Sequence, residues 1–280
     1  MKSRPNNPHK YLHHLFIPLA LFFALLLVQY GYKKAPAIVQ AHADNKLLPI
    51  YCVDRSSDSG APKVSLSFDA AWGNEDTAKI LEVLAKHNVK VTFFMTGGWI
   101  EKYPDDVKAI AAAGHDLANH SENHKQMSKL SASECKEEIM KAHEKVKSLT
   151  GIDMTLFRPP YGDYNNTLIK TANEQCNYHV IQWDVDSLDW KDYTADQIRN
   201  RILNHKHLGN GSIILMHNGA KHTAEALESI IVGLQEKGYE LVPISELVHK
   251  DNYEMDHEGR QHLIGHALNN YKLNQMKYQP

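Results

Sequence analysis

The sequence predicts an α/β protein whose parallel sheet closes into a (β/α) barrel of about seven strands. Two observations carry this prediction. Segments with strand patterns alternate with segments with helical patterns for about seven rounds, which is typical of a parallel sheet with crossover helices. Polar residue types that can do chemistry gather directly after several of the strands, as they do at the carboxyl-terminal rim of a barrel.

Strands are expected where apolar and polar residues alternate, or where β-branched and aromatic residues cluster. Residues 64–68 (Val-Ser-Leu-Ser-Phe) alternate cleanly, and residues 89–95 are rich in β-branched and aromatic side chains. Residues 47–53 are expected to form a segment at an edge of the sheet. The remaining expected strands are residues 116–119, 155–157, 178–183, 212–216 and 239–242.

Helix signals separate these strands. Residues 77–87 carry an apolar stripe with helical spacing. Pro104 opens a helix that ends before Gly114, the usual asymmetry of these two residue types at helix ends. Ser131 and Glu134 form a capping box at the start of the next helix, which a glycine closes. Further helices are expected at residues 166–174, 195–205, 224–237 and 244–249.

The catalytic-sized domain is expected to span residues 63–249, preceded by a linker or edge segment over residues 44–62. Residues 250–280 lack sustained periodicity and are rich in Asn, Gln, His and Lys, so we expect a polar, poorly packed tail. A solvated role is expected for its three histidines, His257, His262 and His266.

Residues 1–43 have the pattern of an export segment. Basic residues precede an apolar run over residues 15–28, which suits a signal peptide or a membrane anchor. Ala-His-Ala at residues 41–43 matches a cleavage signature, so a cleaved signal and an uncleaved anchor both stay open. The basic leader predicts that the main domain lies outside the cytoplasmic membrane, either secreted or anchored by its N-terminus.

The composition of the chain argues against a nucleic-acid partner and against a disulfide-linked fold. The net charge of −2 and the pI of about 6.8 give no electrostatic reason to expect a nucleic-acid partner. Cys52, Cys135 and Cys176 are too few for a disulfide framework. Cys135 falls on the apolar stripe of a helix, where we expect it to be a small buried hydrophobe.

His120 and His124 form the chemical centre of the sequence. Four residues make about one helical turn, so both imidazoles can face the same point, and two imidazoles on one face are half of a zinc-type site. Pairs with this spacing also occur in the leader and in the tail, as chance allows for 18 histidines. Only the middle pair follows an expected strand and has other reactive residue types around it.

Four further strand ends carry chemically useful residues. Alone, each has a structural explanation: Asp69 as a helix cap or turn residue, Arg158 as one half of a surface ion pair, and a histidine as a packed side chain. Together on one rim they predict an active site. Its members outside the histidine pair are Asp69, Arg158, Pro160, Tyr161, Asp189, Trp190, Leu215 and His217.

These residues lie in five ordered motifs that resemble the polysaccharide deacetylases of the NodB-homology family (carbohydrate esterase family four). The resemblance covers roughly residues 63–248 and implies a distorted (β/α) barrel that removes N- or O-acetyl groups from a glycan with the help of a metal. An extended form, Phe-Asp-Ala-Ala-Trp-Gly, resembles a sporulation-type branch in spore-forming Firmicutes. The five motifs are Ser-Phe-Asp at 67–69, His-Ser-x-x-His at 120–124, Arg-Pro-Pro-Tyr at 158–161, Asp-Trp at 189–190 and Leu-x-His at 215–217.

The resemblance implies a role for each hydrolytic residue. A divalent metal, zinc first but with cobalt or another ion open, would bind His120 and His124 and activate a water. Asp69 would be the general base, held ionised by Arg158. The general acid would be a histidine in the last motif, His217.

Other positions would support the acid and the substrate. Asp189 would orient the imidazole of the general acid. The backbone N–H of Tyr161 would help to form the oxyanion hole. The substrate would contact Pro160, and a slot for the acetyl methyl group would lie between Trp190 and Leu215.

One position departs from the family. A second aspartate normally follows the first and binds the metal, but this chain has Ala70 there. Alanine cannot coordinate a metal. Glu75 or Asp76 on the same loop could reach in, or Asp69 could both coordinate and act as the base.

Three functions compete. The leading one is an extracytoplasmic, membrane-associated deacetylase acting on N-acetyl groups of a cell-wall or chitin-type polysaccharide. The alternative is a catalytically silent glycan-binding protein that keeps the barrel but has lost its metal with Ala70. Retention of Asp69, Arg158, Asp189 and His217 favours the enzyme, because a binding protein needs neither base nor acid. A barrel amidase acting on small amides is disfavoured by the export segment.

Overall fold

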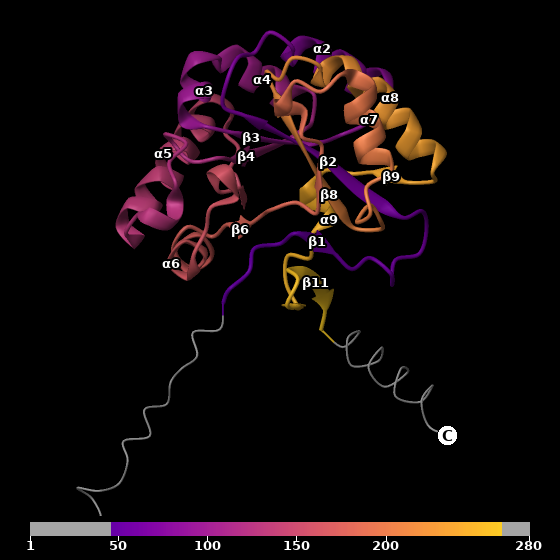
Figure 1. Cartoon of the computed structure of the whole chain (residues 1–280). Coiled ribbons are helices and arrows are strands. Elements are labelled where there is room, and N and C mark those ends of the chain that lie inside the picture. Colours follow the sequence, from indigo (N-terminus) through magenta and orange to yellow (C-terminus); the bar gives the residue numbers. More distant parts are fainter. Residues whose placement is uncertain (1–45, 265–280) are drawn as a thin grey trace, which may run out of the picture. The chain divides into compact units, whose positions relative to one another are not determined.

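A curved sheet forms the centre of the described part of the chain, residues 46–264 of this computed structural model (Figure 1). The predicted export segment, residues 1–43, and the end of the expected tail, residues 265–280, lie outside the described residues. Among residues 46–264, no helix is long and apolar enough to span a bilayer.

Strands β2 (Lys63–Ala70) and β8 (Ser212–Asn218) form the middle of the sheet and pair in parallel along their whole length. Their register sets Asp69 opposite His217. From β2 the sheet continues in parallel through β3 (Thr92–Met95), β4 (Asp116–Asn119), β5 (Leu156–Phe157) and β6 (His179–Val180). The predicted parallel sheet is confirmed, although several strands are shorter than expected.

The segment expected at a sheet edge instead joins the two ends of the ring. Ile50 forms a parallel bridge to Ile181, just after β6, and β1 (Cys52–Val53) pairs with β8 in antiparallel fashion. The Ile50 N–H donates to the Val180 carbonyl at 2.8 Å, and the Val53 N–H donates to the Gly211 carbonyl at 3.0 Å. The expectation of an edge is therefore wrong, and the ring is a distorted barrel of mixed strands.

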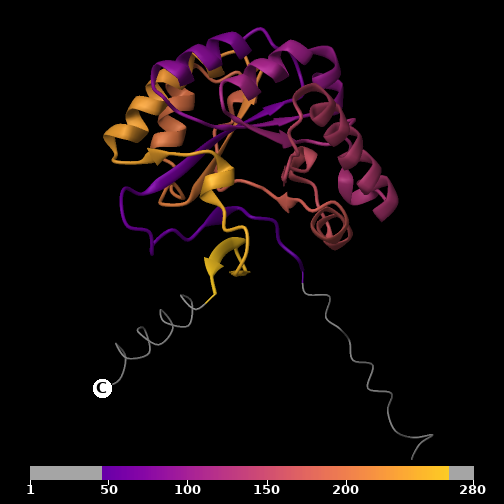
Figure 2. The same cartoon turned by 180° about the vertical axis from the view of Figure 1, so that it is seen from behind.

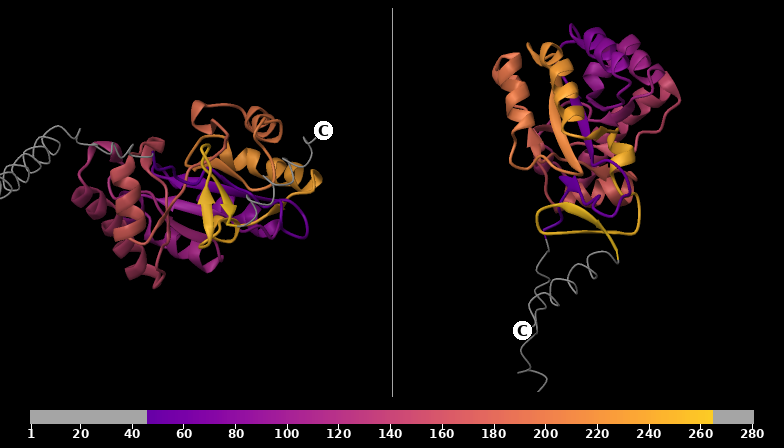
Figure 3. Two further views of the ribbon diagram at one scale, coloured as in Figure 1. Left: turned by 90° about the horizontal axis from the view of Figure 1, so that it is seen from below. Right: turned by 90° about the vertical axis from the view of Figure 1, so that its right-hand side faces the viewer.

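The expected tail is also ordered further than predicted. Strands β10 (Tyr253–Met255) and β11 (Arg260–Leu263) form a hairpin, and β11 pairs with β1 (Figure 3). His262, expected to be solvated, bonds the Asp54 and Asp256 carboxylates at 3.0 Å each. A polar sequence can be ordered in this way, because strand pairing uses backbone groups rather than apolar side chains.

Helices pack along the convex side of the sheet (Figures 1 and 2). The Ser131–Glu134 capping box is present, and Gly151 ends that helix in a left-handed conformation, as predicted. The helix expected at residues 166–174 is instead divided into α6 (Asn166–Lys170) and a π-helical turn (Thr171–Gln175). The other helices are α2 (Thr77–Lys86), α4 (Pro104–Ala112), α5 (Ala132–Thr150), α7 (Ala195–Leu203), α8 (Thr223–Glu236) and α9 (Ile244–Leu247).

Two further short elements have no counterpart in the sequence prediction, and a third keeps part of an expected strand. Helix α3 (Gly97–Lys102) begins with two glycines, which disfavour helix, but Thr96 caps its first turn. Strands β7 (Val185–Asp186) and β9 (Glu240–Leu241) contain two residues each, too few to show a period. Part of the expected strand 239–242 survives as β9.

The alternation of side chains along β2 determines which of them face the interior of the ring. Phe68 and Ala70 are fully buried in the large apolar cluster that contains the inward faces of the helices. Successive side chains of a strand point to opposite faces, so Ser67 and Asp69 face the interior of the ring. Cys135 is fully buried, as expected.

Candidate active site

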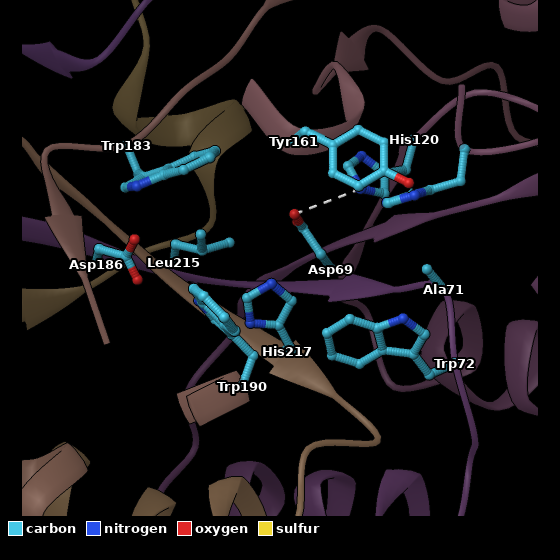
Figure 4. Close-up of a pocket in the computed structure, with 11 residues that line it drawn as sticks. Asp69, Ala71, Trp72, His120, Tyr161, Trp183, Asp186, Trp190, Leu215 and His217 are labelled. Atoms are coloured by element: carbon cyan, nitrogen blue, oxygen red, sulfur yellow. Dashed lines mark ion pairs between the residues drawn. The ribbon is translucent and has the colours of Figure 1, made fainter. Parts of the chain in front are cut away.

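One cavity of about 450 Å³ opens at the carboxyl ends of the strands (Figure 4). It brings together residues from the ends of β2, β4 and β8, from the loops that follow β5 and β6, and from β7 and the turn after it. Its lining residues are Asp69, Ala71, Trp72, His120, His124, Tyr161, Trp183, Asp186, Trp190, Leu215 and His217.

Asp69 and Arg158 form a buried ion pair behind the cavity. One guanidinium nitrogen of Arg158 donates to Asp69 Oδ1 at 2.6 Å, and another donates to Ser67 Oγ at 2.8 Å. The guanidinium also lies 4.0 Å from the centre of the Phe94 ring. Arg158 is completely buried, so its direction is fixed by these contacts.

This pairing keeps the carboxylate ionised. Burial by itself would raise the pKa of Asp69, but the charge of Arg158, followed by His120 and His217, holds that pKa below its ordinary value. Asp69 Oδ2 is left to face the cavity, 3.5 Å from His120 Nε2. An ionised, directed carboxylate can accept a proton there.

His120 is oriented from its far side. Its Nδ1 donates to the Arg158 carbonyl at 2.7 Å, because a carbonyl can only accept. A neutral ring therefore carries its lone pair on Nε2, toward Asp69. Burial lowers the pKa of His120 to about 4, against the opposing effect of Asp69, so the ring is neutral at physiological pH.

His124 converges on the same point, although not through a helical turn as the spacing suggested. Ser121 and His124 have positive φ, 67° and 55°, in a loop that reverses after β4. The two imidazole centres are 5.0 Å apart. Burial, despite the opposing effect of Asp69, lowers the pKa of His124.

The loop is held by side chains that sequence reasoning did not single out. Asn119 Oδ1 accepts the Ser121 N–H at 2.9 Å, while its amide nitrogen donates to the Ile139 carbonyl at 2.8 Å. Glu138 of α5 accepts the backbone N–H and the side-chain amide of Asn123, both at 2.8 Å. These bonds offset the strain of the left-handed residues.

His217 is held on the opposite wall. Its Nδ1 is 2.7 Å from Asp189 Oδ1, and its backbone N–H donates to Asp189 Oδ2 at 2.8 Å. The Thr223 hydroxyl also donates to Asp189 Oδ2, at 2.6 Å. Burial would lower the pKa of His217, but the hydrogen bond and charge of Asp189 outweigh it and raise that pKa above its ordinary value. The imidazolium that a general acid requires is therefore favoured.

The expected substrate contacts are placed unevenly. Tyr161 has φ 61° and a side chain 67% exposed, and Trp190 and Leu215 also line the cavity. Pro160 is buried in the turn before Tyr161 and is not among the residues that line this cavity, so its expected contact with the substrate stays a prediction.

A metal would find only part of a site here. His120 and His124 are neutral imidazoles of the right chemistry, but Ala70 points into the helix layer. The two proposed substitutes do not line the cavity: Asp76 accepts the Gly219 N–H at 2.8 Å, and the Glu75 carboxylate lies over Gly73. Within residues 46–264, no group of three or more His, Cys, Asp or Glu side chains is placed to hold a metal ion.

Four lining residues were not among the predicted site residues: Ala71, Trp72, Trp183 and Asp186. Trp72 stacks on His217, and Trp183 and Asp186 lie on the wall beside Leu215 (Figure 4). Trp72 belongs to the Ala-Ala-Trp-Gly extension of the first motif, which was the available signal. Asp186 stands three residues before Asp189, in the same motif loop.

An ionised carboxylate and a histidine with a raised pKa that face one cavity at the carboxyl ends of barrel strands are an arrangement suited to acid–base hydrolysis. A family model described as polysaccharide deacetylase matches residues 56–181. The peptidoglycan-N-acetylglucosamine deacetylase of Bacillus cereus is 38% identical over 192 residues, 66% of this chain and 68% of that protein. The chain therefore belongs to the polysaccharide deacetylase family, in which several relatives are named as peptidoglycan deacetylases, and the predicted resemblance is confirmed.

Two other similar proteins are not named as active deacetylases. The uncharacterized protein YlxY of Bacillus subtilis is 36% identical over 200 residues, 71% of this chain but 60% of YlxY, so the chain spans less than two thirds of that relative. The structure of a CE4 family pseudoenzyme from Bacillus anthracis has a TM-score of 0.66 and 33% identity, covering 72% of this chain and 69% of that one. A mutant of the latter, 34% identical, is described as having restored enzymatic activity.

Proposed function

We propose that this chain is a deacetylase that removes N-acetyl groups from a cell-wall or chitin-type polysaccharide outside the cytoplasmic membrane. One observation carries the proposal: Asp69 and His217 face the same cavity from opposite walls, each held in its useful protonation state by a buried partner. The names of relatives that deacetylate peptidoglycan support the choice of substrate.

The chain's own residues account for both proton transfers. Asp69 accepts a proton from the attacking water as its oxygen bonds to the acetyl carbon. His217 donates a proton to the amide nitrogen as the C–N bond breaks, which leaves acetate and a free amino sugar. The backbone N–H of Tyr161 would stabilise the intermediate oxyanion, and Leu215 and Trp190 would receive the methyl group.

A divalent metal has an incomplete set of protein ligands. Two imidazoles without a carboxylate at position 70 do not form the three-residue site typical of hydrolytic zinc. Zinc, or cobalt or another divalent ion, would be held by His120 and His124 with water in the remaining positions. The two proton transfers rest on Asp69 and His217.

A second candidate function is glycan binding without catalysis. The burial of Ala70 in the helix layer favours it, because the third metal ligand is missing. The Bacillus anthracis relative described as a pseudoenzyme lends it further support.

Acetate release separates these functions. The purified full chain, supplied with zinc or cobalt, is expected to release acetate from an N-acetylglucosamine oligosaccharide. The matched control is the same oligosaccharide after chemical deacetylation, which should release none. Binding of the acetylated oligosaccharide without acetate release at any metal concentration would contradict the deacetylase and favour the binding protein.

Location gives an independent prediction. The protein is expected to fractionate with the membrane or to be secreted, because a basic leader precedes the apolar run of residues 15–28. Protease added to intact cells of the native organism, once the cell wall is removed, should digest the domain and spare a cytoplasmic control protein. Full-length soluble protein in the cytoplasm would contradict the expectation.

A further inference from the structure

The exposed aromatic side chains of residues 46–264 are concentrated at one place. Three large aromatic residues in this part of the chain are exposed, Trp72, Tyr161 and Trp190, and all three line the cavity. Trp72 is 49% exposed and Trp190 is 50% exposed. Leaving so much indole surface in water is unfavourable, and such a cluster marks a binding surface.

Trp72 is exposed on a fixed backbone. The carbonyl of the next residue, Gly73, accepts the Trp99 indole N–H at 3.1 Å and the Asn218 amide at 3.0 Å. Gly219, with φ 88°, packs so closely that a Cβ there would meet the backbone N and O of Gly73 at 3.1 Å. These contacts hold the loop of Trp72 against the end of β8, so the backbone that carries the exposed indole is fixed in position.

The indole of Trp72 lies flat against the imidazole of His217. The ring centroids are 5.1 Å apart and the planes are inclined by 20°. Asp189 holds the Nδ1 edge of the same imidazole by a hydrogen bond. The stacked indole of Trp72 limits rotation of the imidazole ring about that bond. The offset stack takes up part of one indole face, while Trp72 as a whole stays 49% exposed.

We propose that Trp72 is a sugar-stacking platform that binds a pyranose ring of the glycan beside His217 and, through the same indole, holds the imidazole in plane. The identity of the ligand as an N-acetylated glycan rests on the proposed function, whereas the platform itself rests on the exposure and the stacking.

The chemistry of the two surfaces matches. The substituents of a β-linked glucosamine ring are equatorial, which leaves flat faces of C–H groups. An indole face carries the negative part of the ring quadrupole and attracts such polarised C–H groups. Because His217 donates its proton to the leaving amine, the ring on Trp72 is the sugar that carries that amine or its immediate neighbour.

Calorimetric titration with a chitin-type oligosaccharide of N-acetylglucosamine tests this platform on the full chain. Trp72→Ala is expected to raise the dissociation constant about three- to tenfold, the scale of one aromatic stacking contact. Trp72→Phe keeps a ring and should retain most of the affinity. Ile152→Ala, which removes an exposed apolar side chain outside the cavity, is the matched control and should bind like the wild type.

Turnover provides the readout for the positioning role. Where acetate is released, Trp72→Ala should raise KM and also lower kcat, and Trp72→Phe should rescue both. A structural defect would lower the melting temperature and the active fraction without this split, so thermal unfolding is measured on each variant.

The outcomes separate the platform from the proposed reaction. If the wild type binds the oligosaccharide without releasing acetate and Trp72→Ala still weakens binding, the deacetylase fails and the platform stands. If folded Trp72→Ala binds as tightly as Ile152→Ala, the platform is overturned whatever the activity. A wild type that does not bind the oligosaccharide also overturns it.

Discussion

Replacing His217 by alanine is expected to lower turnover about a hundredfold or more, the scale of a general acid, and to leave the fold intact. The fold should survive because Asp189 keeps two hydrogen bonds after the change, from the backbone N–H at position 217 and from the Thr223 hydroxyl. No buried carboxylate is stranded without a partner. The measurement is kcat for acetate release together with the melting temperature. Unchanged turnover in a folded variant would remove His217 from the mechanism.

Asp189→Asn is the matched variant for the same pair. The wild-type carboxylate raises the pKa of His217, so the imidazolium persists to higher pH than in an isolated histidine. Without that charge the pKa should fall, and the alkaline limb of the activity profile should move to lower pH. The raised pKa also stabilises the fold below the ordinary histidine pKa, and this contribution is lost as pH rises through the folded-state value. The free energy of unfolding should be measured at one pH below the ordinary histidine pKa and at one pH above the folded-state pKa of His217. The difference between the two values should be smaller in the variant than in the wild type.

The sequence predicts those parts of the site in which a single reactive residue stands at the end of a recognisable strand. Asp69, His120 and His217 follow strongly apolar strands, and parallel strands must bring such ends to one rim. The supporting groups were not foreseeable in this way. Asn119 acts through its bond to Ser121, and Trp72 acts through its stacking on His217. Both depend on segments far apart in the chain.

The same distinction between local signals and contacts with distant segments applies to the fold. Long elements with a clear period, such as α5 (Ala132–Thr150), were predicted with their caps. The segment around Ile50 and the hairpin at Tyr253–Leu263 were misjudged, because their order comes from backbone pairing with distant strands. Such pairing leaves little pattern in the paired segment itself, since every residue except proline carries the same backbone groups.

The last prediction concerns metal affinity and follows from the missing carboxylate. Wild-type protein is expected to bind zinc weakly and to lose it readily to a chelator, because His120 and His124 lack a third partner among the described residues. Ala70→Asp should tighten binding if the end of β2 turns so that the new carboxylate leaves the helix layer and faces His120 and His124, the position at which the resemblance implies an anionic ligand. The substitution also has a cost, since the Ala70 methyl group is fully buried in the helix layer. An unpaired carboxylate there should destabilise the metal-free protein.

The two effects predict that the stability of Ala70→Asp depends strongly on metal. Its melting temperature should be lower than that of the wild type with chelator present, and should rise more steeply when zinc is added, because a ligand that binds only the folded state stabilises it. Ala71→Asp is the comparison variant for stability, since it places the same charge on the neighbouring residue, which lines the cavity, and should therefore lower the melting temperature of the metal-free protein less. His120→Ala should abolish the zinc-dependent rise in either background. Tight wild-type binding that Ala70→Asp does not improve would show that Asp69 already serves as the third ligand. Activity that survives both chelator and His120→Ala would exclude a catalytic metal on these histidines.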